Sequence, residues 1–129
     1  MRFLSIYKSR ERGTPPTQEE MDRMGKLIEE GMKNGSLLSV EGCLPSATGA
    51  RVRQSNGQVT VTDGPFTESK EVVGGLAVLQ AASKAEAVQL VKDFLKVAGD
   101  GECEIRQIFT QSDPGACNPH AQLTEQFGG

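Results

Sequence analysis

The sequence contains few of the residues from which ligand sites are most often built. Among its 129 residues there is no tryptophan, a single tyrosine and a single histidine. A row of aromatic rings on which bases or sugars could stack is therefore not available. The net charge of -3 at pH 7 also disfavours contact with phosphate backbones, because such contact depends mainly on arginine and lysine. We expect no direct binding to nucleic acid.

Cysteine and long apolar runs are scarce as well. Cys43, Cys103 and Cys117 are odd in number and far apart, which is more typical of reduced thiols in a cytosol than of a disulfide framework. His120 follows Cys117 closely, but two ligands are too few for a zinc site, so a surface histidine is favoured and no metal or other cofactor is expected. No stretch stays apolar for long enough to form the core of a signal peptide or a membrane span. These absences predict a cytoplasmic protein that does not contact a membrane.

The pattern of the chain predicts one domain over residues 1–110 and a tail or arm over 111–129 that is rich in Gly, Pro, Gln and Asn. Alternating or continuously apolar segments predict strands, and apolar residues at helical spacing predict two helices. The predicted strands cover residues 2–8, 37–41, 50–54, 58–62, 72–80 and 102–110, and the predicted helices run from about 18 to 34 and from about 84 to 98.

Local signals mark where the helices begin and where a hairpin turns. Thr17 stands three residues before Glu20, and Ser83 stands three residues before Glu86. This is the spacing of a capping box, in which each side chain accepts a hydrogen bond from the other residue's free backbone N–H. Asn56-Gly57 lies between two alternating segments, and this pair is a strong signal for a tight β-hairpin.

The order strand, helix, strand, inserted hairpin, strand, helix, strand predicts an α+β fold of the ferredoxin-like βαββαβ type, with both helices on one side of the sheet. Alternation along the strands then divides the side chains between two faces. The predicted helix-covered face holds Leu4, Ile6, Leu38, Val40, Cys103, Ile105 and Phe109, and the other face holds Phe3, Ser5, Tyr7, Leu37, Ser39, Glu41, Glu104, Arg106 and Ile108. The second face is too apolar to be bare and too polar to be a core, so we expect a homodimer in which two sheets pack face to face and leave a cleft.

The tetrapeptide Asp63-Gly64-Pro65-Phe66 follows the predicted hairpin. Taken alone it is a tight turn, because glycine, proline and aspartate each favour turns. Its context is longer, from Thr60 to Glu71 and then Gly74-Gly75-Leu76, and this segment resembles the signature of the DGPF family, also called YCII-related proteins. The resemblance covers about residues 1 to 110 and implies a dimeric α/β-barrel, but most members of that family have no settled activity.

Asp63 is the candidate catalytic residue. Shielded by Phe66, its carboxylate would have a raised pKa and could serve as a general acid or base, although a structural aspartate that only holds the turn is the more common case. Tyr7, Glu41 and Arg106 share the predicted open face with Glu104. Tyr7, Glu41 and Arg106, together with Phe66, could bind a small polar or anionic molecule in the cleft. Alternatively, the polar groups of this face form an ordinary polar network or an ion pair in the dimer interface.

Two functions stay open at this stage. The first is a cofactor-independent isomerase or lyase, in which Asp63 moves a proton while Arg106 and Tyr7 hold the substrate. Some YCII-related proteins carry a histidine in the first helix that pairs with an aspartate, but here Met24 stands near that place and the helix has no histidine. The second is a non-catalytic accessory protein in sigma-factor-linked bacterial transcriptional regulation, which the resemblance implies because genes of that family commonly lie beside those for alternative sigma factors.

Overall fold

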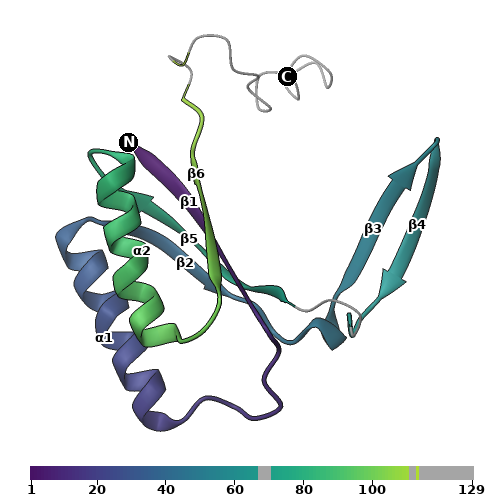
Figure 1. The fold of residues 1–129 in the computed structure, drawn as a ribbon, viewed down its shortest axis with the longest axis horizontal. Helices are drawn as coiled ribbons and strands as arrows, with labels where there is room; N and C mark the ends of the chain where they lie inside the picture. Colours follow the sequence, from purple (N-terminus) through teal and green to yellow (C-terminus); the bar gives the residue numbers. More distant parts are fainter. Residues whose placement is uncertain (67–70, 111–112, 114–129) are drawn as a thin grey trace.

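Within residues 1–66, 71–110 and 113, which the computed structural model describes, the chain forms a four-stranded antiparallel sheet, a separate two-stranded ribbon and two α-helices (Figure 1). The predicted α+β class is confirmed, and the described strands do not close a barrel. The predicted tail over 111–129 lies outside the described residues apart from Asp113. The strands are β1 (Arg2–Ser9), β2 (Leu37–Gly42), β3 (Ala50–Ser55), β4 (Gln58–Asp63), β5 (Val72–Gln80) and β6 (Glu102–Gln107), the helices are α1 (Gln18–Asn34) and α2 (Lys84–Ala98), and a short 3-10 helix covers Ser46–Thr48.

Helix α1 begins and ends at the residues that the sequence indicates. The Thr17 hydroxyl accepts a hydrogen bond from the Glu20 N–H at 3.1 Å, and the Glu20 carboxylate accepts one from the Thr17 N–H at 3.4 Å. This confirms the first predicted capping box, which satisfies two of the free donors at the helix start. Gly35 ends the helix with a φ of 82°, a conformation that glycine adopts without strain.

Helix α2 forms only half of its predicted cap. The Ser83 hydroxyl accepts a hydrogen bond from the Glu86 N–H at 3.2 Å. The return bond from the Glu86 side chain is absent from the described structure. A serine alone still caps a helix well, because it satisfies one free N–H group in the first turn.

The strand order in the sheet is β2-β5-β1-β6, and all neighbours are antiparallel. Helix α1 therefore connects two strands that lie on either side of β5, and α2 connects two strands that lie on either side of β1. Each strand-helix-strand unit leaves a gap that a strand of the other unit fills. Both helices lie side by side on the same side of the sheet (Figure 1).

The core lies between the helices and the sheet, and it reverses the predicted orientation of β1. Phe3 is 2% exposed, Ser5 is buried, and the Tyr7 ring contacts Phe94 of α2. The predicted faces of β1 are thus wrong, because its odd-numbered residues point to the helices and Leu4 and Ile6 point away. The register explains this: Phe3 pairs with Leu79 of β5, and paired residues share a face. The core residues are Phe3, Leu79, Ala81, Ala87 and Val91.

The prediction for β2 is wrong at its start and correct at its end. Leu37 packs against the core, whereas Leu38 is 45% exposed. The register shifts between Leu37 and Ser39, and the extra residue moves the following side chains to the opposite face. Val40, which pairs with Ala77, therefore lies on the helix side as predicted.

The last strand, β6, is shorter than predicted. Cys103 and Ile105 pack against the core as expected, which places Glu104 on the other face. The strand ends at Gln107, so the predicted facing of Ile108 and Phe109 does not apply to strand residues.

Strands β3 and β4 form a hairpin that stands apart from the sheet (Figure 1). Asn56 and Gly57 have φ values of 52° and 77°, and Ser55 pairs with Gln58 across this two-residue turn. This confirms the hairpin predicted from Asn-Gly. Every residue in both strands is exposed. We call β3 and β4 the ribbon.

Candidate functional site

The side of the sheet that the helices leave uncovered has an apolar centre and polar edges. Two rows of paired residues cross it from β2 to β6, and they are Ser39-Val78-Leu4-Arg106 and Glu41-Leu76-Ile6-Glu104. We call these residues the open sheet face. Its aliphatic side chains come from the central strands β1 and β5, and Leu76 is 37% exposed. A mixed face therefore exists, but β1 supplies Leu4 and Ile6 to it in place of the predicted Phe3, Ser5 and Tyr7, which makes its centre more apolar than predicted.

The charged groups of the open sheet face pair locally and do not converge. Arg106 lies 3.4 Å from the Glu104 carboxylate, and Lys8 lies 3.5 Å from the same group. Two strands separate β2 from β6, which puts Glu41 and Arg106 roughly 14 Å apart at the usual strand spacing. Within the described chain, Arg106 thus forms an ion pair with Glu104, which is one of the two predicted alternatives. Glu41 is too far away to join this pair.

Tyr7 is absent from the open sheet face. Its ring centroid lies 5.3 Å from that of Phe94 in an edge-to-face arrangement. Its hydroxyl donates to the carbonyl oxygen of Asp100 at 3.1 Å, and the carbonyl oxygen of Gly99 lies 3.4 Å from the same hydroxyl. Tyr7 therefore fixes the end of α2 to β1, and the predicted grouping of Tyr7 with Glu41 and Arg106 is wrong.

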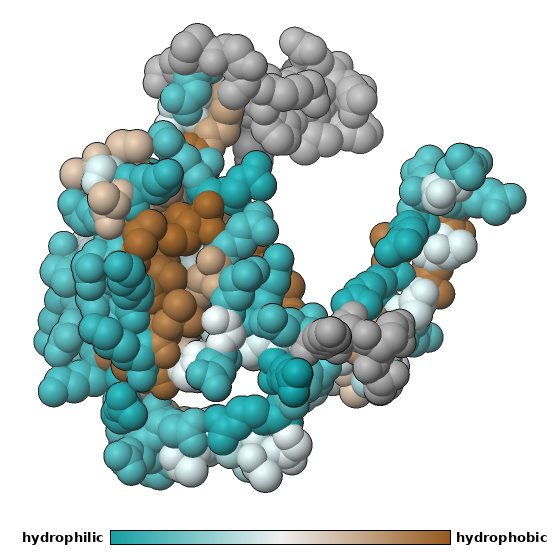
Figure 2. All heavy atoms as spheres, in the orientation of Figure 1, coloured by the Kyte–Doolittle hydropathy of each residue, from teal (hydrophilic) through white to brown (hydrophobic). Residues whose placement is uncertain are grey.

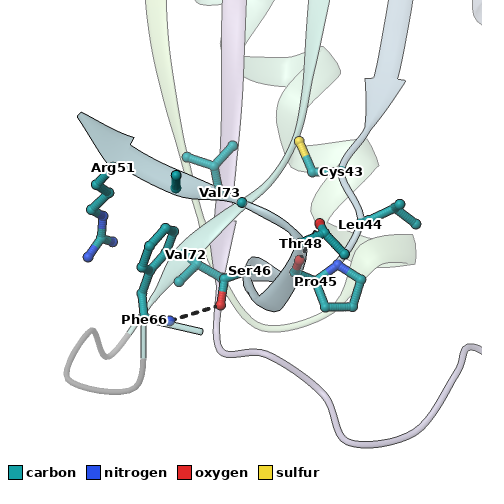
Figure 3. A pocket seen from close by; sticks show the side chains of 11 residues that line it. Cys43, Leu44, Pro45, Ser46, Thr48, Arg51, Phe66, Val72 and Val73 are labelled. Atoms are coloured by element: carbon teal, nitrogen blue, oxygen red, sulfur yellow. Dashed lines mark hydrogen bonds between the residues drawn. The ribbon is translucent and has the colours of Figure 1, made fainter. Parts of the chain in front are cut away.

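The turn at Asp63–Phe66 is anchored by Ser46. The Phe66 N–H donates to the Ser46 hydroxyl oxygen at 3.1 Å (Figure 3). The Ser46 hydroxyl in turn donates to the Glu11 carboxylate. The Ser46 N–H donates to the same carboxylate at 3.2 Å. Ser46 is 9% exposed, so these bonds satisfy a nearly buried polar side chain.

Gly64 lies so close to Ser46 that no larger residue fits. A Cβ atom built at Gly64 would overlap the carbonyl oxygen of Ser46. The Gly64 N–H also donates to the Gly49 carbonyl oxygen at 2.9 Å, and the peptide bond between Gly64 and Pro65 is cis. Close backbone approach, in addition to the turn itself, therefore requires the glycine at this position.

Beside this turn lies a pocket of about 480 Å³, formed by the segment after β2, the base of the ribbon and the start of β5 (Figure 3). Most of its lining is apolar, from Leu44, Val72 and Val73 among others. Arg51 and Phe66 line it as well, and the Arg51 guanidinium lies 3.9 Å from the centre of the Phe66 ring. Phe66, the last residue of the turn, thus holds the positively charged Arg51 side chain in the lining of an apolar pocket.

Asp63 lies next to this pocket without lining it. It pairs with Ala50, which does line the pocket. Asp63 is exposed, so the expected shielding of its carboxylate by Phe66 is not found. The Phe66 ring contacts Arg51 instead.

Sequence reasoning missed Glu11, Ser46 and Arg51 as parts of this site. Glu11 and Ser46 are 35 positions apart in the sequence, and each lies in a segment that shows no periodicity. Arg51 alternates with Arg53 along β3, and nothing in that pattern distinguishes the arginine that lines the pocket from the one that does not. Pro45, Ser46 and Gly49 are residues that favour turns, and they are the local signal for a turn there.

The described groups with clearly shifted pKa values lie outside the pocket lining. Hydrogen bonds, first from the Arg12 guanidinium and then from the Thr17 backbone N–H, together lower the pKa of Glu20 to about 2, and Glu20 in turn raises the pKa of Arg12. Burial under the helices raises the pKa of the Cys103 thiol. The shifts at Glu20 and Arg12 thus come from the N-terminal cap of α1, and the shift at Cys103 comes from its position beside the core.

Clusters of metal-ligating side chains and long apolar helices are both absent from the described part of the chain. Residues 1–66, 71–110 and 113 contain no group of three or more His, Cys, Asp and Glu placed to hold a metal ion. Cys117 and His120 lie outside the described residues. Neither described helix is long and apolar enough to span a bilayer.

Comparison with known proteins gives a family and little more. The model of the YCII-related domain matches residues 1–112. An uncharacterised protein of Rhizobium meliloti (strain 1021) is 33% identical over 75 residues, which cover 57% of this chain and 60% of that protein, so the match spans three fifths of the relative's length. A solved structure of the de novo designed protein Foldit4 aligns over 85% of this chain and 98% of its own with 22% identity, but its TM-score of 0.32 is too low to argue a shared fold.

Proposed function

The chain belongs to the YCII-related family, and from that premise we propose that it binds a small polar or anionic molecule in the pocket beside the Asp63–Phe66 turn, as a homodimer of ferredoxin-like subunits. The observation that carries the proposal is the position of Arg51. Its guanidinium lies over the Phe66 ring at 3.9 Å, at a pocket of suitable size.

The pocket suits a ligand with an apolar body and an anionic group. Its volume of about 480 Å³ falls in the range of roughly 300–1,000 Å³ that is usual for small-molecule sites. Its apolar walls favour the body of the ligand through burial. Arg51 offers a planar set of N–H donors that matches a carboxylate or phosphate. Stacking on Phe66 orients this side chain before the ligand arrives, which reduces the entropy lost on binding.

The homodimer is supported by the open sheet face. Its four central aliphatic side chains form one continuous apolar strip, and such strips on a soluble domain mark interaction sites. A second copy packed face to face would cover this strip by twofold symmetry. The strand order β2-β5-β1-β6 is the order expected for a ferredoxin-like sheet, which supports that finer assignment. In such a dimer Glu41 and Arg106 would lie at the interface between the two sheets. Their predicted role in ligand binding stays part of this proposal.

A catalytic role for Asp63 remains a prediction within this proposal. Asp63 follows the ribbon at the edge of the pocket, and its carboxylate is open to solvent. A proton transfer of the isomerase or lyase type would need the substrate to cover it. Replacing Asp63 with Asn would then abolish turnover and leave the melting temperature nearly unchanged. One observation favours the alternative, an accessory role in transcriptional regulation: α1 contains no histidine that could form an acid-base pair with Asp63.

Binding is tested by calorimetric titration with benzoate, succinate and phenyl phosphate, together with native mass spectrometry of the purified protein. Arg51→Gln should weaken the binding of the best probe by about tenfold or more, because a charge-assisted hydrogen bond is lost. Arg53→Gln is the matched control, since Arg53 lies two residues further along the same face of β3 and does not line the pocket. Equal affinities for the two variants would refute the site, as would a wild-type protein that binds none of the probes and carries no ligand.

A further inference from the structure

The ribbon has one apolar face and one cationic face. Val52 pairs with Val61, and Gln54 pairs with Val59, so these residues share a face, which we call the valine face. The opposite face carries Arg51, Arg53, Thr60 and Thr62. The three valines are 69%, 61% and 63% exposed at positions 52, 59 and 61. The ribbon is therefore amphipathic, and its apolar side is bare in the single chain.

A bare two-stranded ribbon is at most marginally stable in water. Independent stability needs a third strand or packing against another element. Here all residues of β3 and β4 are exposed, and the ribbon stands away from the body with open space between them (Figure 1; Figure 2). Hydrophobic atoms are visible along it in the space-filling view (Figure 2). The valine face therefore lacks, within the described chain, the packing that usually stabilises a two-stranded ribbon.

The area needed for a stable dimer indicates that this partner is a second copy. At a strand spacing of about 4.8 Å and a rise of about 3.3 Å per residue, strands of 8, 6, 9 and 6 residues give the sheet a projected area of roughly 460 Å², against about 800 Å² of accessible surface per partner in a standard stable interface. The ribbon adds roughly 200 Å² by the same measure. A dimer that uses the sheet alone is thus small, and one that also uses the ribbon is closer to the usual size.

Charge complementarity points to the same partner. The ribbon carries Arg51 and Arg53 and a single carboxylate, Asp63, at its base. The whole chain has a net charge of -3, so the body is more acidic than the chain as a whole. The ribbon of one copy is therefore attracted to the body of another at long range, with the arginines on the face that points away from the contact. The valine face carries one carboxylate, Asp63, at its base, and its middle, at Val52, Val59 and Val61, is uncharged and suits the centre of an interface.

We propose that the ribbon is an arm that lies against the body of a second copy of this chain, with its valine face inward. Two such arms, exchanged by the twofold axis, extend the contact between the open sheet faces. This inference rests on the homodimer proposed above and adds a surface that the sheet contact does not include.

The test compares dimer dissociation constants of the full chain by analytical ultracentrifugation. Val59→Glu with Val61→Glu places two charges on the valine face of β4. Thr60→Glu with Thr62→Glu places the same two charges on the opposite face of the same strand. We expect the dissociation constant to rise by tenfold or more in the first variant and to stay within about threefold of wild type in the second. Because all four positions are exposed, circular dichroism should show an unchanged fold in both.

Ile6→Glu on the open sheet face separates this inference from the dimer on which it rests. If Ile6→Glu dissociates the dimer and the valine variant does not, the dimer stands, the arm contact is wrong, and the valine face belongs to a different partner. If the wild-type chain is monomeric at micromolar concentration, both fail. As a second readout on the unmodified chain, amide hydrogen exchange in β3 and β4 should slow as the protein concentration rises through the dissociation constant. Exchange that is independent of concentration would overturn the arm contact.

Discussion

The body and the ribbon are built from similar strands and differ in what covers them. Strands β1 and β3 both combine apolar and polar residues, yet Phe3 is 2% exposed and Val52 is 69% exposed. The difference comes from the helices, which lie on one side of the body and leave the ribbon bare (Figure 1). Alternation therefore specifies a strand, whereas its burial depends on elements far away in the sequence.

The comparison predicts that truncation in the body costs far more than truncation in the ribbon. Phe3→Ala should lower the free energy of unfolding by about 3–5 kcal/mol, because it removes a buried ring and leaves a cavity between the sheet and α2. Val61→Ala should change it by less than about 0.5 kcal/mol, because Val61 is 63% exposed. Urea denaturation of monomeric protein measures both. Equal losses would show that the ribbon is as well packed as the body within one chain.

The junction between body and ribbon should show an intermediate effect. Gly64→Ala forces a methyl group into the Ser46 carbonyl, so we expect a loss of about 1–3 kcal/mol, as for other overpacked sites. Gly25→Ala is the control, because a Cβ atom at Gly25 of α1 meets no other atom within 4 Å. That variant should gain about 0.5–1 kcal/mol from helix propensity. A Gly64→Ala protein as stable as wild type would mean that the turn does not press on Ser46.

Features encoded within a few residues were predictable from the sequence. The capping box of Thr17 and Glu20 and the hairpin at Asn56-Gly57 depend on spacing and on φ preferences alone, and both are confirmed. The register between β1 and β5 shifts at Gly74 and Gly75, and glycine within a strand often marks such a bulge. Gly75 also lies close to β2, since a Cβ atom there would be 2.8 Å from the Glu41 carbonyl oxygen.

Features that depend on distant contacts were not predictable. Strand β1 has apolar residues on both faces, so alternation cannot say which face the helices cover, and the prediction chose the wrong one. The pairing of Phe3 with Leu79 decides it. In the same way, the bonds between Glu11 and Ser46 join two irregular segments, and no pattern within either segment indicates them.

The corrected position of Tyr7 gives a smaller test of what fixes α2 to the body. Tyr7→Phe removes the hydroxyl that donates to the Asp100 carbonyl and keeps the ring against Phe94. We expect a loss of about 1 kcal/mol in the free energy of unfolding and no change in the binding of the anionic probes to the pocket. The opposite result, unchanged stability with loss of probe binding, would restore the predicted ligand-binding role of Tyr7.

Among the tests of the body, the smallest effect on stability is expected at the exposed start of α1, where Arg12 forms an ion pair with Glu20 of the capping box. The Arg12 guanidinium lies 2.7 Å from the Glu20 carboxylate and is the main reason for its pKa of about 2. Because this pKa is lowered from an ordinary value of 4.5, the ionised carboxylate stabilises the folded chain above about that pH, and the contribution fades as the pH falls toward 2.

Glu20→Gln should therefore lower the melting temperature at pH 7 by only a few degrees, since both partners are exposed and screened by solvent. The gap from wild type should close as the pH is lowered from 4.5 to 2. Glu19→Gln is the control, because Glu19 lies in the same first turn without contributing to the capping box, and it should follow wild type more closely at every pH. If the difference in melting temperature between Glu20→Gln and wild type stayed constant down to pH 2, the stabilisation would come from the neutral hydrogen bonds of the cap. The ion pair with Arg12 would then not stabilise the body.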